Sequence, residues 1–560
     1  MRSRSESAGS SAGSPTTRAQ RPEGRVGRGA RSHDRGALAI VLHTHMPYVE
    51  GFGTWPFGEE WLWEAIAGCY LPLLDLLDAR DPPLTLSLTP VLCDQLSAPG
   101  LAERFERFID GTRRFTHSED ISGLRAGGHP GLAAELERAW RSDYEHARER
   151  LAARGGDLLG AFAPHARWTS SATHAVLPLL ATDAGVRLQV RAGIAAHVDR
   201  FAGGDSPRGD ASRGRDASHA GGEVPRRGGG LRDWQGGFWL PECAYAPWLE
   251  PILAAAGVRG TCVELTSRYG LRAREHLRPL RTESGVVLWP IDRATISLVW
   301  SDAGYPADGA YRDYHRHTVH HHQPWRNDGA AYDPALALAR AREHAADFVS
   351  RTRERLARDA PGLPGGGLAV CALDTELLGH WWYEGIAWLE AVIEECARQG
   401  LELVRLDEEA PERFEPAALG GGAARGAGGA GRGAGGAGGT AGGPAEDWPA
   451  SSWGQGGDLS TWSGPAVAEL AFAARAAELA TLTAATEGRA GPAAVRELLA
   501  LQASDWAFMI SRGLAVPYAH ERFDGHRAAL DRALADGPEA SVDGLRGLAS
   551  YADPSVLLAP

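Results

Sequence analysis

The sequence predicts an α/β protein in which parallel strands alternate with helices to form a TIM-like barrel. Apolar stretches of strand length recur along residues 37–410, and segments with helical periodicity separate them. Several stretches are continuously apolar, which is typical of parallel strands buried on both faces. The chain has 560 residues, enough for a large core and more than one domain. Strand–helix alternation over this length indicates a β/α barrel.

The barrel elements can be assigned in chain order. The predicted strands are Ala37–His43, Leu84–Thr89, Val186–Val190, Gly237–Leu240, Gly260–Glu264, Leu368–Leu373 and Leu401–Arg405. The predicted helices include Trp61–Leu77, Trp248–Ala256, Pro334–Arg358 and Ile386–Gln399. Between Leu101 and Leu159 no strand pattern occurs and the apolar spacing is helical. We therefore expect a helical insertion in the barrel at about residues 98–165.

The remaining segments differ from the barrel in composition. Residues 1–36 are rich in Arg, Ser and Gly, and we expect a disordered basic tail. Residues 203–230 lack apolar periodicity and predict a flexible insert, while residues 411–447 predict a Gly/Ala-rich linker. Residues 448–560 are Ala/Leu-rich with helical spacing, which predicts a C-terminal helical domain that contributes to the functional site.

Composition narrows the classes of partner and compartment. The net charge of −13 argues against nucleic-acid binding and suits a neutral substrate. No run of 18 apolar residues occurs, so no membrane span is expected. The six cysteines lie in apolar segments without a CxxC pair, which favours buried free thiols in a reducing cytoplasm. We expect a cytoplasmic monomer without a cofactor.

Two motifs carry most of the functional information, Phe238–Tyr245 (FWLPECAY) and Ala372–Trp382 (ALDTELLGHWW). Each places a carboxylate at the end of an apolar run and surrounds it with aromatic side chains. Aromatic faces stack on the C–H surfaces of sugars, and two opposed carboxylates can cleave a glycosidic bond. The pair of motifs therefore predicts a carbohydrate-active site, provided that folding brings the two segments together.

The two acids are expected to play different parts. Glu242, held as a carboxylate by hydrogen-bond donors, could attack an anomeric carbon. Asp374 lies beside Leu373 and two tryptophans, and partial desolvation raises a carboxyl pKa, as a general acid requires. Glu376 is a rival for this second role, but it lies farther from the end of the strand, so we favour Asp374. Retention of configuration would place the two carboxyl groups about 5–5.5 Å apart.

Histidines and tryptophans supply candidate sugar contacts. His43 and His45 share one side of the first strand, and neutral imidazole offers both a donor and an acceptor to sugar hydroxyls. HxH is also a metal-ligand spacing, but no convincing further ligands accompany it, and we predict no metal. His174 is a third candidate, with a core or capping histidine as the alternative. Trp453 and Trp462, in and after a Gly-rich turn, would be costly to expose unless a glucan chain covered them.

Five ordered blocks resemble the signature regions of glycoside hydrolase family 57, most of all those of its 1,4-α-glucan branching enzymes. The resemblance covers roughly residues 37–530. The blocks are His-Thr-His-Met-Pro-Tyr (43–48), Ser-Ala-Thr-His (171–174), Trp-Leu-Pro-Glu-Cys-Ala-Tyr (239–245), Asp-Thr-Glu-Leu-Leu-Gly-His-Trp-Trp (374–382) and Ser-Ser-Trp-Gly (451–454).

The resemblance implies an incomplete (β/α)7 barrel, a retaining mechanism and no metal. It implies that Glu242 is the nucleophile and Asp374 the proton donor and acid/base. Trp453, Asp505 and Trp300 match family positions that contact the glucan. The expected activity is to cleave an α-1,4 link and transfer the chain to a 6-hydroxyl, making an α-1,6 branch in a glycogen-like glucan.

The sequence departs from the family pattern at two places. Where family members usually carry Gly-Arg-Asp before the site tryptophan, this chain has Pro290-Ile291-Asp292, and Arg293 would supply the guanidinium. The loop Gly270–Leu280 is Arg-rich where family members often have an aromatic tip that excludes water. This change leaves the ratio of branching to hydrolysis open.

Three alternatives remain at this point. A 4-α-glucanotransferase or α-amylase would keep the fold and change the acceptor. A metal-dependent polysaccharide deacetylase is suggested by the histidine pair beside acids, although no HxxxH ligand pair is found near its first acidic pair. A non-catalytic glucan-binding protein would not need both carboxylates.

Overall fold

The computed structural model describes residues 36–53, 56–201, 234–407, 410–419, 448–542 and 544–559. The predicted basic tail, apart from Gly36, and the predicted flexible insert lie outside these residues. So does the greater part of the predicted Gly/Ala linker.

The main sheet is a curled row of parallel strands, which confirms the predicted fold class. Its strands are β1 (Ala37–Thr44), β2 (Thr85–Leu88), β3 (Ala166–Ser170), β4 (Gly236–Trp239), β5 (Val258–Val263), β7 (Val287–Pro290) and β8 (Leu368–Asp374). They lie in the order β7-β5-β4-β3-β2-β1-β8, every neighbouring pair parallel. Within the described ranges β7 and β8 do not pair as strands. The sheet is thus an incomplete (β/α)7 barrel, open on one side.

Short strands extend the edges of this sheet. β6 (Leu280–Arg281) runs antiparallel to β7, and β10 (Ala417–Ala418) pairs with β6. β9 (Glu402–Leu403) pairs with the first residues of β1. Residues 411–419, which we assigned to the linker, therefore belong to the folded barrel: most of α15 (Ala410–Arg413) and all of β10 lie there.

One predicted strand is wrong and four strands were not predicted: β3 and β7 in the main sheet, and the short β6 and β10 at its edge. Val186–Val190 lies inside α9 (Asp183–Phe201), because an alternation of apolar and polar residues over only five positions does not distinguish a strand from part of a helix. β3 is short and begins with the partly exposed Ala166 and the exposed Arg167, so it shows no long apolar run. β7 lies within the apolar run Val286–Ile291, which was not assigned to a strand. The other strand predictions correspond to β1, β2, β4, β5, β8 and, at the edge, β9.

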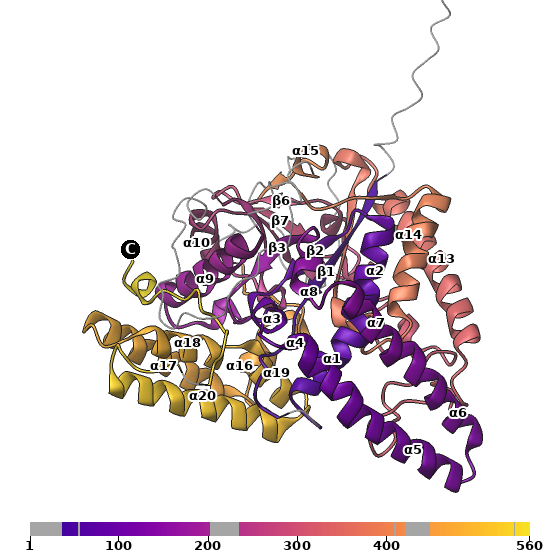
Figure 1. Ribbon diagram of the computed structural model, residues 1–560. Coiled ribbons are helices and arrows are strands. Elements are labelled where there is room, and N and C mark those ends of the chain that lie inside the picture. Colours follow the sequence, from indigo (N-terminus) through magenta and orange to yellow (C-terminus); the bar gives the residue numbers. More distant parts are fainter. Residues whose placement is uncertain are drawn as a thin grey trace, which may run out of the picture.

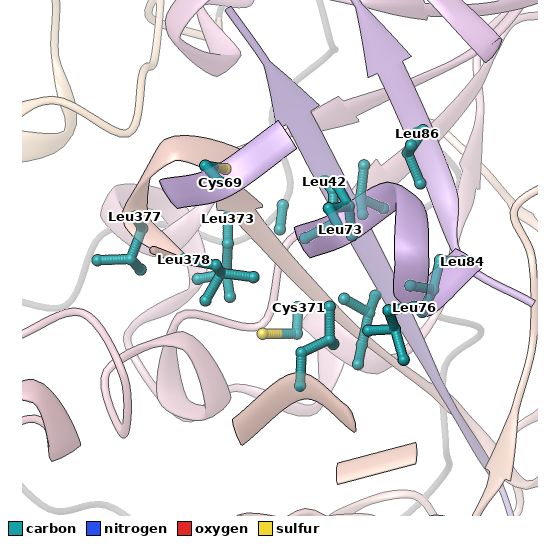
Figure 2. Close-up of a cluster of buried hydrophobic side chains, with 14 of the residues drawn as sticks. Leu42, Cys69, Leu73, Leu76, Leu84, Leu86, Cys371, Leu373, Leu377 and Leu378 are labelled. Atoms are coloured by element: carbon teal, nitrogen blue, oxygen red, sulfur yellow. The ribbon is translucent and has the colours of Figure 1, made fainter. Parts of the chain in front are cut away.

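Helices cover the convex face of the barrel (Figure 1). They are α1 (Glu59–Ala65), the π-helix η2 (Ile66–Tyr70), α2 (Leu71–Arg80), α3 (Pro90–Leu96), α9, α10 (Glu250–Ala255), α13 (Pro334–Asp359) and α14 (Gly385–Gln399). Figure 2 shows Leu73 and Leu76 of α2 gathered with Leu42 of β1 and Cys371 of β8. Each fully buried leucine of this kind stabilises the fold by about 1.5–3 kcal/mol.

A helical segment lies between β2 and β3, in the part of the chain where we expect the insertion. It contains α4 (Leu101–Arg107), η3 (Phe108–Arg113), α5 (Arg114–Ala126), α6 (Pro130–Ala139), η4 (Trp140–Glu145), α7 (His146–Ala153) and α8 (Leu158–Phe162). Figure 1 shows α5 and α6 projecting side by side from the barrel. The insertion therefore widens one flank of the molecule and leaves the strand order intact.

The C-terminal region is helical, with α16 (Ser460–Ser463), α17 (Ala468–Thr486), α18 (Pro492–Leu501), α19 (Ser504–Ser511) and α20 (Val516–Asp536). These helices pack beside the barrel (Figure 1). The backbone N–H of Ser504 donates to the carbonyl of His174, 3.2 Å away, which fixes the start of α19 to the chain after β3. No helix in the described part of the chain is long and apolar enough to cross a membrane.

Candidate active site

The candidate site lies where β1, β3, β4 and β8 end at the same edge of the sheet. His43 of β1 is in register with Asp374 of β8, so the two residues are neighbours across the strands. The chain after β3 carries His174, and the chain after β4 carries Glu242. Active sites of β/α barrels form at the C-terminal ends of the strands, and this site follows that rule.

The backbone turns sharply at the two residues that follow β3 and β4. Glu242 has φ 63° and ψ 21°, and the next residue, Cys243, has φ 49°. His174 has φ 60°. Left-handed backbone costs a non-glycine residue roughly 1–3 kcal/mol and is found where the surrounding structure imposes it. Both turns therefore hold their side chains in orientations that a plain strand end would not give.

Two hydrogen-bond donors hold the Glu242 carboxylate. The indole Nε1–H of Trp453 donates to Oε2 at 2.8 Å, and the Ser504 hydroxyl donates to Oε1 at 3.0 Å. Burial raises the pKa of Glu242 to about 6, while these two hydrogen bonds favour the ionised form. At neutral pH the group is an ionised, oriented carboxylate, as an attacking nucleophile requires.

Asp374 has the opposite environment. No described residue donates a hydrogen bond to its carboxyl group. Burial first, and then the negative charges of Glu376 and Glu242, raise the pKa of Asp374 well above its usual value. A carboxyl group that is both desolvated and close to other carboxylates keeps its proton, which suits a general acid.

Glu376, the rival acid, is committed to other contacts. The Tyr70 hydroxyl donates to its Oε1 at 2.7 Å, and the backbone N–H of His45 donates to the same oxygen at 3.1 Å. Burial raises the pKa of Glu376 to about 7, and these donors oppose the rise. Glu376 lies in the 3-10 turn η11 (Thr375–Leu377) and connects β8 to the end of β1. This arrangement favours Asp374 as the acid.

Three imidazoles stack beside the carboxylates. The ring centroids of His45 and His174 are 3.9 Å apart, and those of His43 and His174 are 4.9 Å apart. Burial and neighbouring histidines lower the pKa of both His43 and His174 well below the usual value, so these two rings are neutral. The structure therefore brings together the three predicted histidines.

His45 differs from the other two because Asp505 faces it. Its Nε2 lies 3.0 Å from Oδ1 of Asp505. Burial alone would lower the pKa of His45, but the Asp505 charge, assisted by Glu376 and Glu242, raises it above the usual value. Asp505, predicted to contact the glucan, thus has a protein partner in addition.

The predicted tryptophans occupy three kinds of position. Trp453 touches Glu242 directly, and its backbone N–H also donates to the Glu242 carbonyl at 3.0 Å. Trp300 is 43 % exposed and stacks on Trp381 with 5.3 Å between centroids, so its outer face is open to a ligand. Trp462 is 3 % exposed. The prediction of an exposed Trp462 is wrong.

Trp462 supports the Gly-rich turn from behind. A Cβ at Gly454 would lie 2.7 Å from the Trp462 ring, so only glycine fits over the indole. Arg293 has a similar supporting position: it donates to Glu264 at 2.9 Å and to the Trp453 carbonyl at 2.8 Å. The guanidinium therefore fixes the loop that carries Trp453, and its predicted contact with a sugar stays a prediction.

Sequence reasoning missed three functional contacts. Ser504 was not singled out, although its hydroxyl donates to Glu242. Tyr70 and Glu264 were not singled out, and they hold Glu376 and Arg293. No local sequence signal pairs Ser504 with Glu242, because 262 residues separate them. Among the residues described, no three His, Cys, Asp or Glu side chains are grouped to hold a metal ion.

Comparisons with known proteins identify the family of this chain. Residues 231–419 match "Glycosyl hydrolase family 57", and residues 467–544 match "1,4-alpha-glucan branching enzyme, C-terminal". A 1,4-alpha-glucan branching enzyme of Thermococcus kodakarensis is 30 % identical over 567 residues, covering 88 % of this chain and 73 % of that protein. A probable 1,4-alpha-glucan branching enzyme of Mycobacterium tuberculosis is 31 % identical over 542 residues, covering 88 % and 91 %.

A solved structure gives the same result for the fold. The GH57-type branching enzyme from Pyrococcus horikoshii superposes with a TM-score of 0.74 at 28 % identity, covering 93 % of this chain and 97 % of that one. The resemblance predicted from the five sequence blocks is confirmed. The chain belongs to glycoside hydrolase family 57, among its 1,4-α-glucan branching enzymes.

Proposed function

We propose that the protein is a retaining 1,4-α-glucan branching enzyme that works by double displacement, with Glu242 as nucleophile and Asp374 as acid and base. The proposal rests on the different surroundings of two buried carboxyl groups: Glu242 has hydrogen-bond donors that favour its ionised form, whereas Asp374 lies near other negative charges. Glu242 accepts hydrogen bonds from Trp453 and Ser504, while Asp374 has a raised pKa. One group is thereby kept ionised and the other protonated.

In the first step, Asp374 gives its proton to the glycosidic oxygen of an α-1,4-glucan. Glu242 attacks the anomeric carbon, the C–O bond to the leaving chain breaks, and a β-linked glycosyl ester forms. The leaving chain departs with the proton as a neutral 4-hydroxyl.

In the second step, the ester has removed the negative charge of Glu242. That charge is one of the causes of the raised pKa of Asp374, so the pKa falls when the ester forms. Asp374 then accepts the proton of an acceptor 6-hydroxyl, whose oxygen attacks the anomeric carbon and expels Glu242. Two inversions give an α-1,6 link with retained configuration.

The surrounding groups fit the binding of a neutral polysaccharide. His45 and the exposed face of Trp300 offer a hydrogen-bonding group and a stacking surface. The match of residues 467–544 favours branching over the 4-α-glucanotransferase and α-amylase alternatives, because that match is described by the branching activity. Glycogen-like glucan is the proposed substrate. Six buried free cysteines support a reducing compartment such as the cytoplasm.

Incubation of the purified protein with amylose tests the proposal. New α-1,6 linkages, counted by proton NMR, should appear, and debranching should release short linear chains. Glu242→Gln should lower the rate by about 10³-fold or more, since it removes the nucleophile. Loss of iodine-staining amylose without α-1,6 signals would instead establish an amylase or a 4-α-glucanotransferase.

A further inference from the structure

A chain of hydrogen bonds runs from the interior of the barrel to the Glu242 carboxylate. It begins at Ser87 of β2, whose Oγ lies 3.4 Å from Nδ1 of His43. Nε2 of His43 lies 2.9 Å from Nε2 of His174. The chain continues through Ser504, which belongs to the C-terminal helices: Nδ1 of His174 lies 2.9 Å from its Oγ.

The proton positions along these hydrogen bonds can be assigned one after another, starting from the Glu242 carboxylate. The Ser504 hydroxyl donates to Oε1 of Glu242, because a carboxylate can only accept. The serine oxygen must then accept from Nδ1–H of His174, which leaves Nε2 of this neutral ring as an acceptor.

The same reasoning fixes the next ring. The two Nε2 atoms are in hydrogen-bond contact and both rings are neutral, so His43 carries its proton on Nε2 and donates to His174. Nδ1 of His43 is then an acceptor for the Ser87 hydroxyl. All four donors point toward Glu242, and aligned hydrogen bonds polarise one another.

We propose that Ser504 is a positioning residue that orients Glu242 and stabilises its negative charge as the last member of this directed chain. The proposal rests on the proposed function of Glu242 as nucleophile. In this proposal His43 and His174 have a role besides their predicted sugar contacts: their hydrogen bonds set the direction in which the Ser504 hydroxyl donates.

The placement of Ser504 is itself enforced by the backbone. Its N–H donates to the His174 carbonyl at 3.2 Å, and the adjacent Ala175 and Ala503 form an antiparallel bridge. The side chain does not cap α19, because the N-cap residue of α19 is Ala503. Ser504 is 3 % exposed, so water cannot readily replace its hydroxyl. The hydroxyl proton is therefore available for Glu242, while the hydroxyl oxygen accepts from His174.

The direct test is the protonation of Glu242 in Ser504→Ala. A water-soluble carbodiimide with glycinamide labels protonated carboxyl groups, and peptide mass spectrometry separates Glu242 from Asp374. The midpoint of Glu242 labelling should move to higher pH by about one unit, because the ionised form loses a donor. The acid limb of the pH profile of kcat/KM for branching should move the same way, with a roughly five-fold loss at pH 6 and a roughly ten-fold loss well below it.

Matched variants separate this role from a general loss of structure. Ser504→Thr keeps the hydroxyl and should restore the wild-type midpoint. Ser511→Ala, on the same helix with its hydroxyl bonded to the Phe508 carbonyl, should leave the midpoint unchanged. Ser504→Cys, nearly isosteric with a weak donor, replaces the alanine variant if that protein does not fold.

The outcomes for this inference and for the proposed function are distinct. An unmoved labelling midpoint in Ser504→Ala, or an equal shift in Ser511→Ala, overturns the directed chain whatever the activity. Full branching activity in Glu242→Gln overturns the role of Glu242 and leaves the labelling result standing as a statement about its carboxyl group.

Discussion

The barrel and the C-terminal region contribute to the candidate site in different ways. The barrel supplies the groups that would form and break bonds, Glu242 after β4 and Asp374 at the end of β8. The region after residue 448 supplies groups that set the charge of one of them: Trp453, Ser504 and Asp505. Each of these three contacts or electrostatically influences Glu242. None of the three is among the causes of the raised pKa of Asp374.

This difference explains how one end of a barrel can hold two acids with opposite tasks. Asp374 gets its high pKa from burial and from other carboxylates on barrel strands and turns. Glu242 is equally desolvated, and its ionisation depends on donors that arrive from a separate part of the chain. Docking of the region after residue 448 therefore completes the surroundings of the proposed nucleophile, whereas the surroundings of the proposed acid lie in the barrel itself.

The largest expected effect comes from the barrel side of the comparison. Asp374→Asn should lower branching of amylose by about 10²–10⁴-fold, because the leaving chain no longer receives a proton. A maltosyl fluoride, whose leaving group needs no proton, should still form the glycosyl ester at a rate much closer to wild type. Steady-state rates on both substrates and trapping of the ester by mass spectrometry check this.

Glu376→Gln is the matched control, because Glu376 lies two residues from Asp374 and is also buried. It should not show this dependence on the leaving group. If Glu376→Gln reproduced the pattern and Asp374→Asn did not, the acid would be Glu376.

Trp453→Phe tests the C-terminal side with the next largest effect. It keeps a ring and removes the Nε1–H that donates to Oε2 of Glu242. Hydrogen bonds to charged groups contribute about 1.5–3 kcal/mol, so the rate at pH 6 should fall about 10–100-fold. The pKa of Glu242 should rise above about 6, and the acid limb of the pH profile should move to higher pH.

Trp462→Phe is the control for this variant. Trp462 lies behind the same turn, and its indole N–H has no partner among the described residues. Its replacement should lower the melting temperature without moving the acid limb. An acid limb at the wild-type pH in Trp453→Phe would show that the indole donor does not set the ionisation of Glu242.

The same two regions differ in what the sequence could predict. β1, β4 and β8 lead into motifs whose apolar runs and polar ends are local in sequence, so both carboxylates and the histidine pair could be found by inspection. The helical insertion and the C-terminal helices were also evident from apolar spacing. β3, in contrast, has too few apolar residues to stand out, and the strand-like alternation at Val186–Val190 belongs to a buried helix.

The contacts that tune Glu242 could not be predicted in this way. Ser504 reaches Glu242 across 262 residues of chain, and nothing in a Ser-Asp-Trp sequence indicates which partner it meets. Trp462 illustrates the opposite error: it was expected to be exposed unless a ligand covered it, while packing places it behind the turn that carries Trp453. Arg293 also supports this turn, and its predicted contact with a sugar stays a prediction. Local sequence patterns therefore locate the candidate catalytic residues, whereas the residues that hold them in place depend on tertiary contacts.

The smallest expected effect is a shift of the Glu242 pKa in the direction opposite to that expected for Trp453→Phe. It therefore tests most sharply how the C-terminal region sets the charge of Glu242. Asp505 is a C-terminal group whose negative charge raises the pKa of Glu242, whereas Trp453 and Ser504 lower it. Asp505→Asn removes the charge and keeps the shape. His45 then loses the partner that raises its pKa, and a less protonated His45 lowers the pKa of Glu242 less. The direct effect of Asp505 is the larger of the two, so the acid limb of kcat/KM should move to lower pH, by about half a unit or less.

Asp524→Asn, which changes an exposed carboxylate on α20, should leave the acid limb at the wild-type pH. A shift of Asp505→Asn to higher pH would mean that His45 dominates, and that Asp505 supports the nucleophile through the barrel histidine instead of opposing it directly.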